Sequence, residues 1–282
     1  MDADERKQFA LHDLKDVLRA LEELGFPCTL IGGQAVYCWA GLFLSGDVAL
    51  QQFAKLTDFL SKDIDFQGTA QAAKAIARKL GCRAEVPGLR QAFGNLMAGK
   101  LRVVVAGVPL SIEILRKVPG FEVRNFSRYA VREEVGDVVV QLLDPVGMLM
   151  AKSWNVVNIS KEGRRDTEQL FIMVACVRGY LRLLLVQARL SEIPIRGFLS
   201  TMERVLIFSE SAAGRKAAEK CSIDWQHILP CEIENASEPE LLALREKRLP
   251  RWRLKIKRHR LGPPQNPLHR RMLGILAETA RP

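Results

Sequence analysis

The stretch Ser61-Lys62-Asp63-Ile64-Asp65-Phe66, downstream of Leu30-Ile31-Gly32-Gly33, decides the fold. Side chains alternate between the two faces of a β-strand, so the two Asp side chains point to one face and Ile64 and Phe66 to the other. Two carboxylates on one face of a sheet can bind a divalent cation together. The sequence therefore predicts a strand at residues 63–66 with one buried apolar face and one acidic face.

A second signal comes from the two glycines. An apolar strand is expected at residues 28–31, Gly32-Gly33 follow it directly, and a helix is expected at residues 34–43. Glycine has no Cβ, so backbone N–H groups in such a turn can approach a phosphate closely. A glycine turn followed by an Asp pair on the next strand indicates a site that handles a nucleotide.

The remaining pattern divides the chain into an α/β part and a helical part. Alternating apolar positions predict strands at residues 82–86, 91–96, 101–106, 110–115 and 138–143, with a tight turn at 107–109. Helices are expected at about residues 6–24 and 69–80, and Asp144-Pro145 is a typical helix start. Beyond it the pattern predicts helices at residues 146–159, 167–190, 195–209, 214–221 and 239–247. We therefore expect an α+β fold, with a mixed sheet flanked by helices at residues 1–143 and a helical domain at residues 144–244.

Residues 245–282 form a third part, a basic extension. Residues 245–271 contain eleven Lys or Arg and one Glu, together with four Pro. From residue 251 to residue 260 the cations alternate with Trp252, Leu254 and Ile256, which predicts a ribbon with one charged face. The pattern indicates a poorly packed extension that either contacts an RNA backbone or serves as a solubilising tail.

Composition narrows the class of protein. The chain has 282 residues, 48% of them hydrophobic, which can form a sizeable core, and a formal net charge of +10, which favours a polyanionic partner. The six cysteines form no Cys-x-x-Cys pair, so reduced, buried thiols are expected. The start of the chain lacks the basic and apolar regions of a signal peptide, and the longest apolar stretch, residues 170–177, is too short to span a bilayer. We expect a cytoplasmic protein without a membrane partner.

A third acid completes the pattern, because Glu113 lies in the apolar strand expected at residues 110–115. The order of the glycine turn, Asp63-x-Asp65 and Glu113 resembles the nucleotidyltransferase superfamily of the polymerase-β type. Within it the chain is most similar to the AbiEii and minimal-nucleotidyltransferase group, which includes toxin components of toxin–antitoxin systems. The resemblance covers roughly residues 25–175. Members tend to carry a lysine in the first helix of the helical half and an Arg/Lys-Asp pair where the next helix begins, and Lys152 and Arg164-Arg165-Asp166 stand in those places.

The resemblance implies a Mg²⁺-dependent enzyme that moves an NMP from an NTP to an acceptor. Two Mg²⁺ ions would be held by Asp63 and Asp65, and Glu113 would complete the ion near the acceptor hydroxyl and help to deprotonate it. The residues that the resemblance assigns to nucleotide binding are Gly32, Gly33, Lys152, Asp166 and Arg165, with Arg164 as the alternative to Arg165.

The acceptor and the activity stay open. The basic surplus favours RNA, for example a tRNA end, and the toxin-like resemblance implies an antitoxin partner. Gly33 stands where many members have Ser, and Glu113 where Asp is common, so a catalytically inactive protein of the same fold that binds nucleotide, nucleic acid or a partner is an alternative. A small-molecule adenylyltransferase of the antibiotic-modifying kind is another. Lys152 and Asp166 also have structural readings, as a snorkelling lysine and a helix-start acid.

Overall fold

The computed structural model describes residues 15–25, 28–46, 63–88, 95–105, 107–121, 126–135, 137–159, 165–256 and 266–280. The chain forms two compact units. The first consists of Met1–Cys38 and Phe59–Met148, and the second of Trp39–Asp58 and Leu149–Pro282. The fold class is α+β, as predicted, while the domain boundaries expected from the sequence stay a prediction. Each unit is described by itself below.

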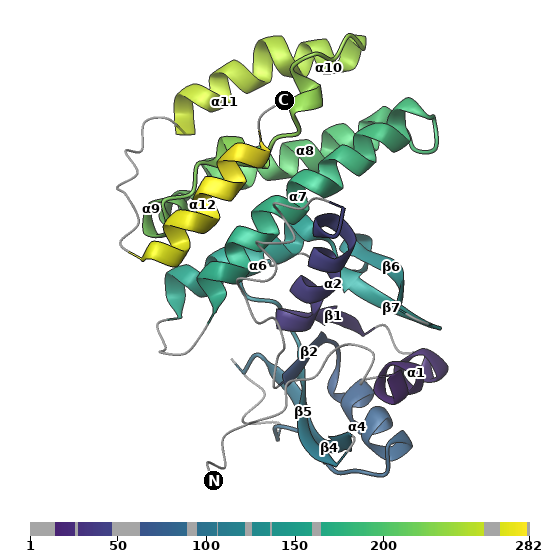
Figure 1. The fold of residues 1–282 in the computed structure, drawn as a ribbon. Coiled ribbons are helices and arrows are strands. Elements are labelled where there is room, and N and C mark those ends of the chain that lie inside the picture. The colour runs from purple at the N-terminus through teal and green to yellow at the C-terminus, as the bar shows by residue number, and fades with distance from the viewer. Residues whose placement is uncertain are drawn as a thin grey trace. The chain divides into compact units, whose positions relative to one another are not determined.

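The described strands of the first unit form one seven-stranded mixed sheet in the order β3-β4-β5-β2-β1-β7-β6 (Figure 1). β2 is antiparallel to β1 and parallel to β5, and β4 is antiparallel to β5. The strands are β1 (Thr29–Ile31), β2 (Asp63–Gln67), β3 (Ala84–Glu85), β4 (Met97–Val105), β5 (Val108–Leu115), β6 (Ala130–Val135) and β7 (Val138–Leu143).

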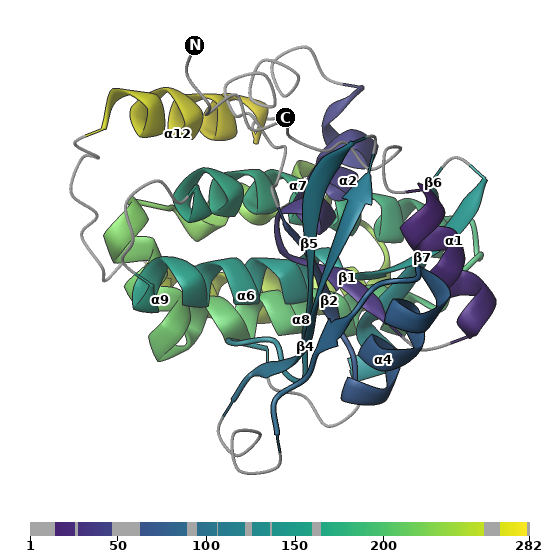
Figure 2. The ribbon, with the colours of Figure 1, turned by 90° about the horizontal axis from the view of Figure 1, so that it is seen from below.

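β2 and β5 each have one buried face and one more exposed face, whereas all three residues of β1 are buried. On β2 and β5 the buried face consists of Ile64, Phe66, Ile112 and Ile114, each at most 1% exposed. Two helices, α1 (Lys15–Leu24) and α4 (Ala70–Lys79), lie on the same side of the sheet, where α1 contacts β7 and α4 contacts β4 (Figure 2). The predicted alternation of buried apolar and open polar side chains on β2 is therefore confirmed.

The helices of the rest of the chain are mostly those expected. The predicted helix start is confirmed, since Asp144 Oδ1 accepts a hydrogen bond from Gly147 N at 2.7 Å at the beginning of α6. The division between the units falls within α2 and α6. The α-helices are α2 (Gly32–Leu44), α6 (Pro145–Asn158), α7 (Asp166–Arg189), α8 (Ile195–Glu210), α9 (Ala212–Cys221), α10 (Pro239–Ala243), α11 (Leu249–Ile256) and α12 (Pro267–Thr279), with short 3₁₀ helices at Phe126–Tyr129, Trp225–Ile228 and Cys231–Ile233 and a π-helical turn at Leu244–Arg248.

Helix α7 lies at the centre of the hydrophobic core of the second unit. Its residues from Leu170 to Val177 are at most 2% exposed, and α8 and α12 pack against it. The helix continues past Arg178 and Arg182, so by length and composition alone it could cross a membrane, but 61% of its most apolar window is buried inside the protein, as in the core helix of a soluble protein. A cytoplasmic location stays a prediction.

The basic segment after residue 245 is helical where the structure describes it. Residues 251–256 belong to α11, and Trp252 is fully buried, with its Nε1 donating a hydrogen bond to Ser209 Oγ at 2.7 Å. The predicted ribbon is therefore wrong for these residues. Leu249, Trp252 and Ile256 are three and four positions apart, which is also the spacing of one helix face. Residues 257–260 lie outside the described residues.

Helix α12 is also packed, contrary to the expected loose extension. Met272 and Leu276 are fully buried. Arg178 of α7 is 4% exposed and donates hydrogen bonds to Leu276 O at 3.1 Å and to Thr279 Oγ1 at 2.6 Å. The buried guanidinium thus caps the last turn of α12, and the described parts of the extension belong to the core of the second unit.

Candidate functional site

The glycine turn and the Asp pair lie against each other in the first unit. β1 pairs with β2 so that Ile31 is opposite Asp65, and α2 begins at the next residue, Gly32. Gly32 has a φ of +72°, and a Cβ added there would lie 2.0 Å from Asp65 Oδ2. Both the backbone conformation and the contact disfavour other residue types. Gly32 therefore allows the Asp65 carboxylate to lie over the start of α2.

The start of α2 also suits an anion. The first N–H groups of a helix have no partners within the helix, and the helix dipole places partial positive charge there. Gly33 brings no side chain that would cover these donors. A phosphate bound at this helix end would lie beside the Asp65 carboxylate, an arrangement that calls for a cation between the two negative groups.

Three charged side chains form a row across neighbouring strands on the open face. Asp65 on β2 is opposite Glu113 on β5, and Glu113 is opposite Lys100 on β4. Neighbouring strands lie about 4.8 Å apart, so these side chains are adjacent. Asp63 is two residues before Asp65 and opposite Ser111. Asp63, Asp65 and Glu113 therefore share one face of the sheet, Asp63 exposed and the other two half-buried.

Glu113 is engaged by a lysine. Lys100 Nζ lies 2.7 Å from Glu113 Oε1, with the two side chains 32% and 25% exposed. The hydrogen bond to this carboxylate raises the pKa of Lys100, and the charge of Asp63 acts in the same direction. Ion pairs with this much solvent contact contribute only about 0–1 kcal/mol to stability. The pair is therefore weak enough for a more highly charged cation to replace the lysine.

The donor set suits Mg²⁺, which prefers carboxylate oxygens together with water. Within the described ranges, however, no three His, Cys, Asp or Glu side chains lie close enough together to hold a metal ion. Asp63, Asp65 and the helix start fit a cation-assisted phosphate site, and Glu113 has to leave Lys100 before it can become a third ligand. Two bound Mg²⁺ ions stay a prediction.

Sequence reasoning missed Lys100. The hairpin of β4 and β5 pairs Val105 with Val108 across the turn. Equal steps back along β4 and forward along β5 from that pair lead to Lys100 and Glu113. The turn expected at residues 107–109 would have placed Val103 opposite Glu113 instead, so only the observed pairing of Val105 with Val108 identifies Lys100.

The other predicted site residues belong to the second unit. Lys152 of α6 is 5% exposed, and its Nζ lies 3.8 Å from Asp166 Oδ1 at the start of α7. Asn155 Nδ2 donates a hydrogen bond to the same Asp166 oxygen at 3.1 Å. Arg165 is exposed and immediately precedes α7, while Arg164 lies outside the described residues.

This cluster gives the buried lysine a structural explanation. A buried ammonium needs an anionic or polar partner, and Asp166 supplies one without any phosphate. The pair also joins α6 to α7. The expectation that the Arg-Asp pair stands at the beginning of a helix is confirmed, whereas nucleotide binding by Lys152, Arg165 and Asp166 stays a prediction.

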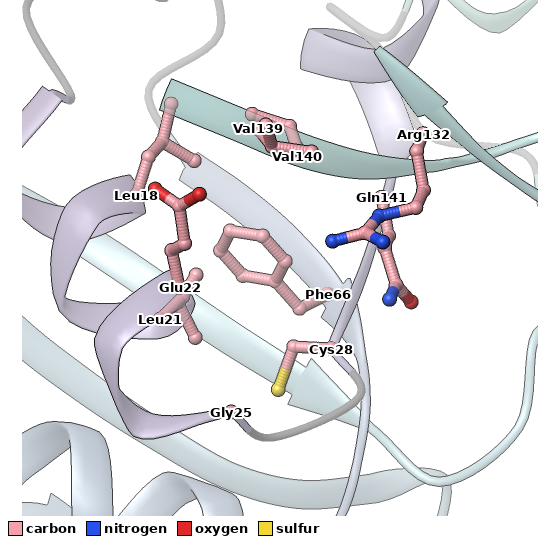
Figure 3. A pocket seen from close by; sticks show the side chains of 10 residues that line it. All are labelled: Leu18, Leu21, Glu22, Gly25, Cys28, Phe66, Arg132, Val139, Val140 and Gln141. Atoms are coloured by element: carbon pink, nitrogen blue, oxygen red, sulfur yellow. The ribbon is translucent and has the colours of Figure 1, made fainter. Parts of the chain in front are cut away.

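A cavity of about 210 Å³ lies elsewhere in the first unit (Figure 3). Leu18 and Leu21 of α1 face Phe66 there, with Arg132 and Gln141 at another side. Its lining includes none of the predicted site residues. Burial raises the pKa of the Cys28 thiol in this lining to about 11, so the thiol stays protonated.

Comparison of the chain with models of protein families found no match, and comparison with curated proteins found none either.

Proposed function

We propose that this protein is a Mg²⁺-dependent nucleotidyltransferase that moves an NMP from an NTP to an acceptor hydroxyl. One observation carries the proposal. The two motifs separated by about thirty residues in the sequence meet in the fold, where Gly32 leaves room for the Asp65 carboxylate at the start of α2. A helix end that attracts phosphate and a carboxylate that attracts a cation are thereby adjacent.

The roles of the residues follow from their positions. Gly32 and Gly33 would bind triphosphate oxygens through backbone N–H groups. Asp63 and Asp65 would hold the divalent cations, which stabilise the attacking and departing oxygens when bound. Glu113, opposite Asp65 in the sheet, would accept the proton of the acceptor hydroxyl once Lys100 no longer holds it.

The class of acceptor follows from charge. The net charge of +10 favours a polyanion, from which we infer an RNA acceptor such as a tRNA end. The resemblance to the toxin-like group implies in addition a cytoplasmic enzyme that is neutralised by an antitoxin partner. The basic residues near the C-terminus are part of this charge, although the described ones lie on packed helices.

Incubation of the purified protein with α-labelled NTPs, Mg²⁺ and total RNA tests the proposal. We expect labelled RNA with the wild type and none with Asp63→Ala/Asp65→Ala. Asp137→Asn is the matched control, because Asp137 is an exposed carboxylate that pairs with Lys15 and Arg19. Equal absence of label in all proteins would exclude an RNA acceptor, and aminoglycosides would then test the small-molecule alternative.

A second candidate function is nucleotide binding without turnover. The Lys100–Glu113 ion pair favours it, since a carboxylate that is held by a lysine is less available to a metal ion or to an acceptor hydroxyl. Calorimetric titration with each NTP in the presence of Mg²⁺ separates the two functions when it is run beside the labelling assay. Binding without label transfer to any acceptor supports this candidate, and turnover contradicts it.

A further inference from the structure

The face of the sheet that carries Asp63, Asp65 and Glu113 also carries a lysine, Lys100. Lys100, Glu113 and Asp65 are in one row across β4, β5 and β2, and Lys100 Nζ lies 2.7 Å from Glu113 Oε1. Asp63 lies on the same face, two residues before Asp65 along β2. The lysine is therefore attracted by the carboxylates that the proposed function assigns to a divalent cation.

Lys100 also reduces the charge repulsion that this face of the sheet has when no metal ion is bound. Like charges directly opposite each other on neighbouring strands repel, and Asp65 and Glu113 are such a pair. A tethered ammonium beside Glu113 removes part of that repulsion. A divalent cation would do the same with twice the charge, so the lysine and the cation compete for one carboxylate.

We infer that Lys100 is a built-in counter-cation that occupies Glu113 in the metal-free protein and is displaced when a divalent cation binds. This inference rests on the proposed function, because it assumes that Asp63 and Asp65 bind the cation. It makes Lys100 a positioning residue, which acts through Glu113 and sets the affinity of the site for metal. The two states differ only in which cation neutralises Glu113.

Titration with Mn²⁺, followed through the electron paramagnetic resonance signal of the free ion, measures this competition without any activity assay. We expect Lys100→Met to bind Mn²⁺ about tenfold more tightly than the wild type, since one unit positive charge beside the bound ion is removed. Lys100→Gln repeats the test with a polar neutral side chain, and thermal melts establish that both variants are folded.

Arg102→Met is the matched control. Arg102 is two residues along β4 from Lys100, on the same face, but its side chain is 74% exposed and its Nη2 lies 3.8 Å from Glu85. Screening by solvent and salt should limit its effect on the Mn²⁺ affinity to about twofold or less. Equal effects of the two substitutions would mean a general charge effect and would overturn the inference.

A second measurement follows the lysine itself. The Lys100 amine is held in its ion pair with Glu113, which limits its access to an acylating reagent. Saturating Mn²⁺ should therefore increase the rate at which Lys100 is acetylated in the wild type. Lys79, which pairs with Glu23 on the helical side, should react at an unchanged rate. An unchanged rate at Lys100 with the metal bound would contradict displacement.

Failure of the inference and failure of the proposed function give different results. If the wild type binds Mn²⁺, Asp65→Asn does not, and Lys100→Met gains no affinity, the metal site stands and the competition is refuted. If none of the proteins binds Mn²⁺, both the inferred competition and the proposed function are refuted. If only the Lys100 variants bind, the competition is established and the wild-type site is closed to metal.

Discussion

Gly32 leaves the space that the Asp65 carboxylate fills, since a Cβ at Gly32 would lie 2.0 Å from Asp65 Oδ2. Two motifs that the sequence separates thus depend on each other sterically. The contact also explains, without any ligand, why a glycine occupies position 32. A substitution at Gly32 should disturb the carboxylate as well as the backbone.

Gly32→Ala is expected to destabilise the protein more than Gly81→Ala. Both glycines have positive φ, at +72° and +64°, and nothing lies within 4 Å of a Cβ at Gly81. The shared backbone penalty is about 1–2 kcal/mol. Urea unfolding should show an additional loss for Gly32→Ala of at least about 1 kcal/mol, because the carboxylate must move. Equal losses would show that the contact with Asp65 has no energetic weight.

Lys152→Met should destabilise the second unit by about 3–5 kcal/mol, because the buried Asp166 carboxylate then loses the ammonium that faces it and keeps only hydrogen-bond partners such as Asn155. The double variant Lys152→Met/Asp166→Leu should recover part of this loss. Lys79→Met, in an exposed pair with Glu23, is the control, with an expected loss of about 0–1 kcal/mol. If Lys152→Met were nearly as stable as the wild type, the result would instead favour the predicted role of Lys152 in binding a phosphate.

Trp252→Ala and Leu254→Ala separate the helix from the ribbon at the basic C-terminal segment. In a ribbon the two side chains would share a face and behave alike. In α11 Trp252 is fully buried and Leu254 is 65% exposed. We therefore expect losses of about 3–5 kcal/mol for Trp252→Ala and within about 0.5 kcal/mol for Leu254→Ala in chemical unfolding. Similar losses of stability in the two variants would support the ribbon and contradict the helix.

Glu210 should make stability depend on pH in the acid range. Burial acts to raise its pKa, but hydrogen bonds from Lys255 and Arg248 outweigh burial and hold the pKa below its ordinary value of 4.5. A depressed pKa in the folded state stabilises the protein above about pH 4.5, and this contribution is lost as the pH falls through the folded pKa.

The midpoint of urea unfolding should therefore be lower for Glu210→Gln than for the wild type at pH 7, with a difference that shrinks below pH 4.5. Glu240→Gln, at an exposed position of α10, controls for the loss of one negative charge. A difference between wild type and Glu210→Gln that stays constant down to pH 3 would contradict the assignment.

Much of the fold was predictable because its main elements have clear periodicity. β2 and β5 alternate strictly between buried and open positions, and α6 begins at its capping Asp144. β6 (Ala130–Val135) was missed, because Arg132 and Glu134 make it polar and its place is set by pairing with β7. Of the strand expected at residues 91–96, residues 91–94 lie outside the described residues, and β4 begins at Met97.

The candidate site was predictable only in part. Local spacing placed Asp63 and Asp65 on one face, but the partner of Glu113 depends on the register of β4 with β5. The partner of Lys152 depends on where α7 begins relative to α6, which the spacing of residues does not specify. The helices α11 and α12 were not predicted for a similar reason. A short stretch in which cations and apolar residues alternate is compatible with the spacing of a strand and with that of a helix, and tertiary packing determines which one forms.

The most direct test of the central claim is the rate of NMP transfer from α-labelled NTP to RNA by the wild type and by Asp65→Asn at matched Mg²⁺ concentrations. The substitution keeps the shape of the side chain beside Gly32 and removes its charge. We expect the rate to fall by about 10²–10³-fold, while Asp137→Asn retains the wild-type rate. Equal rates for the wild type and Asp65→Asn would contradict the proposed site.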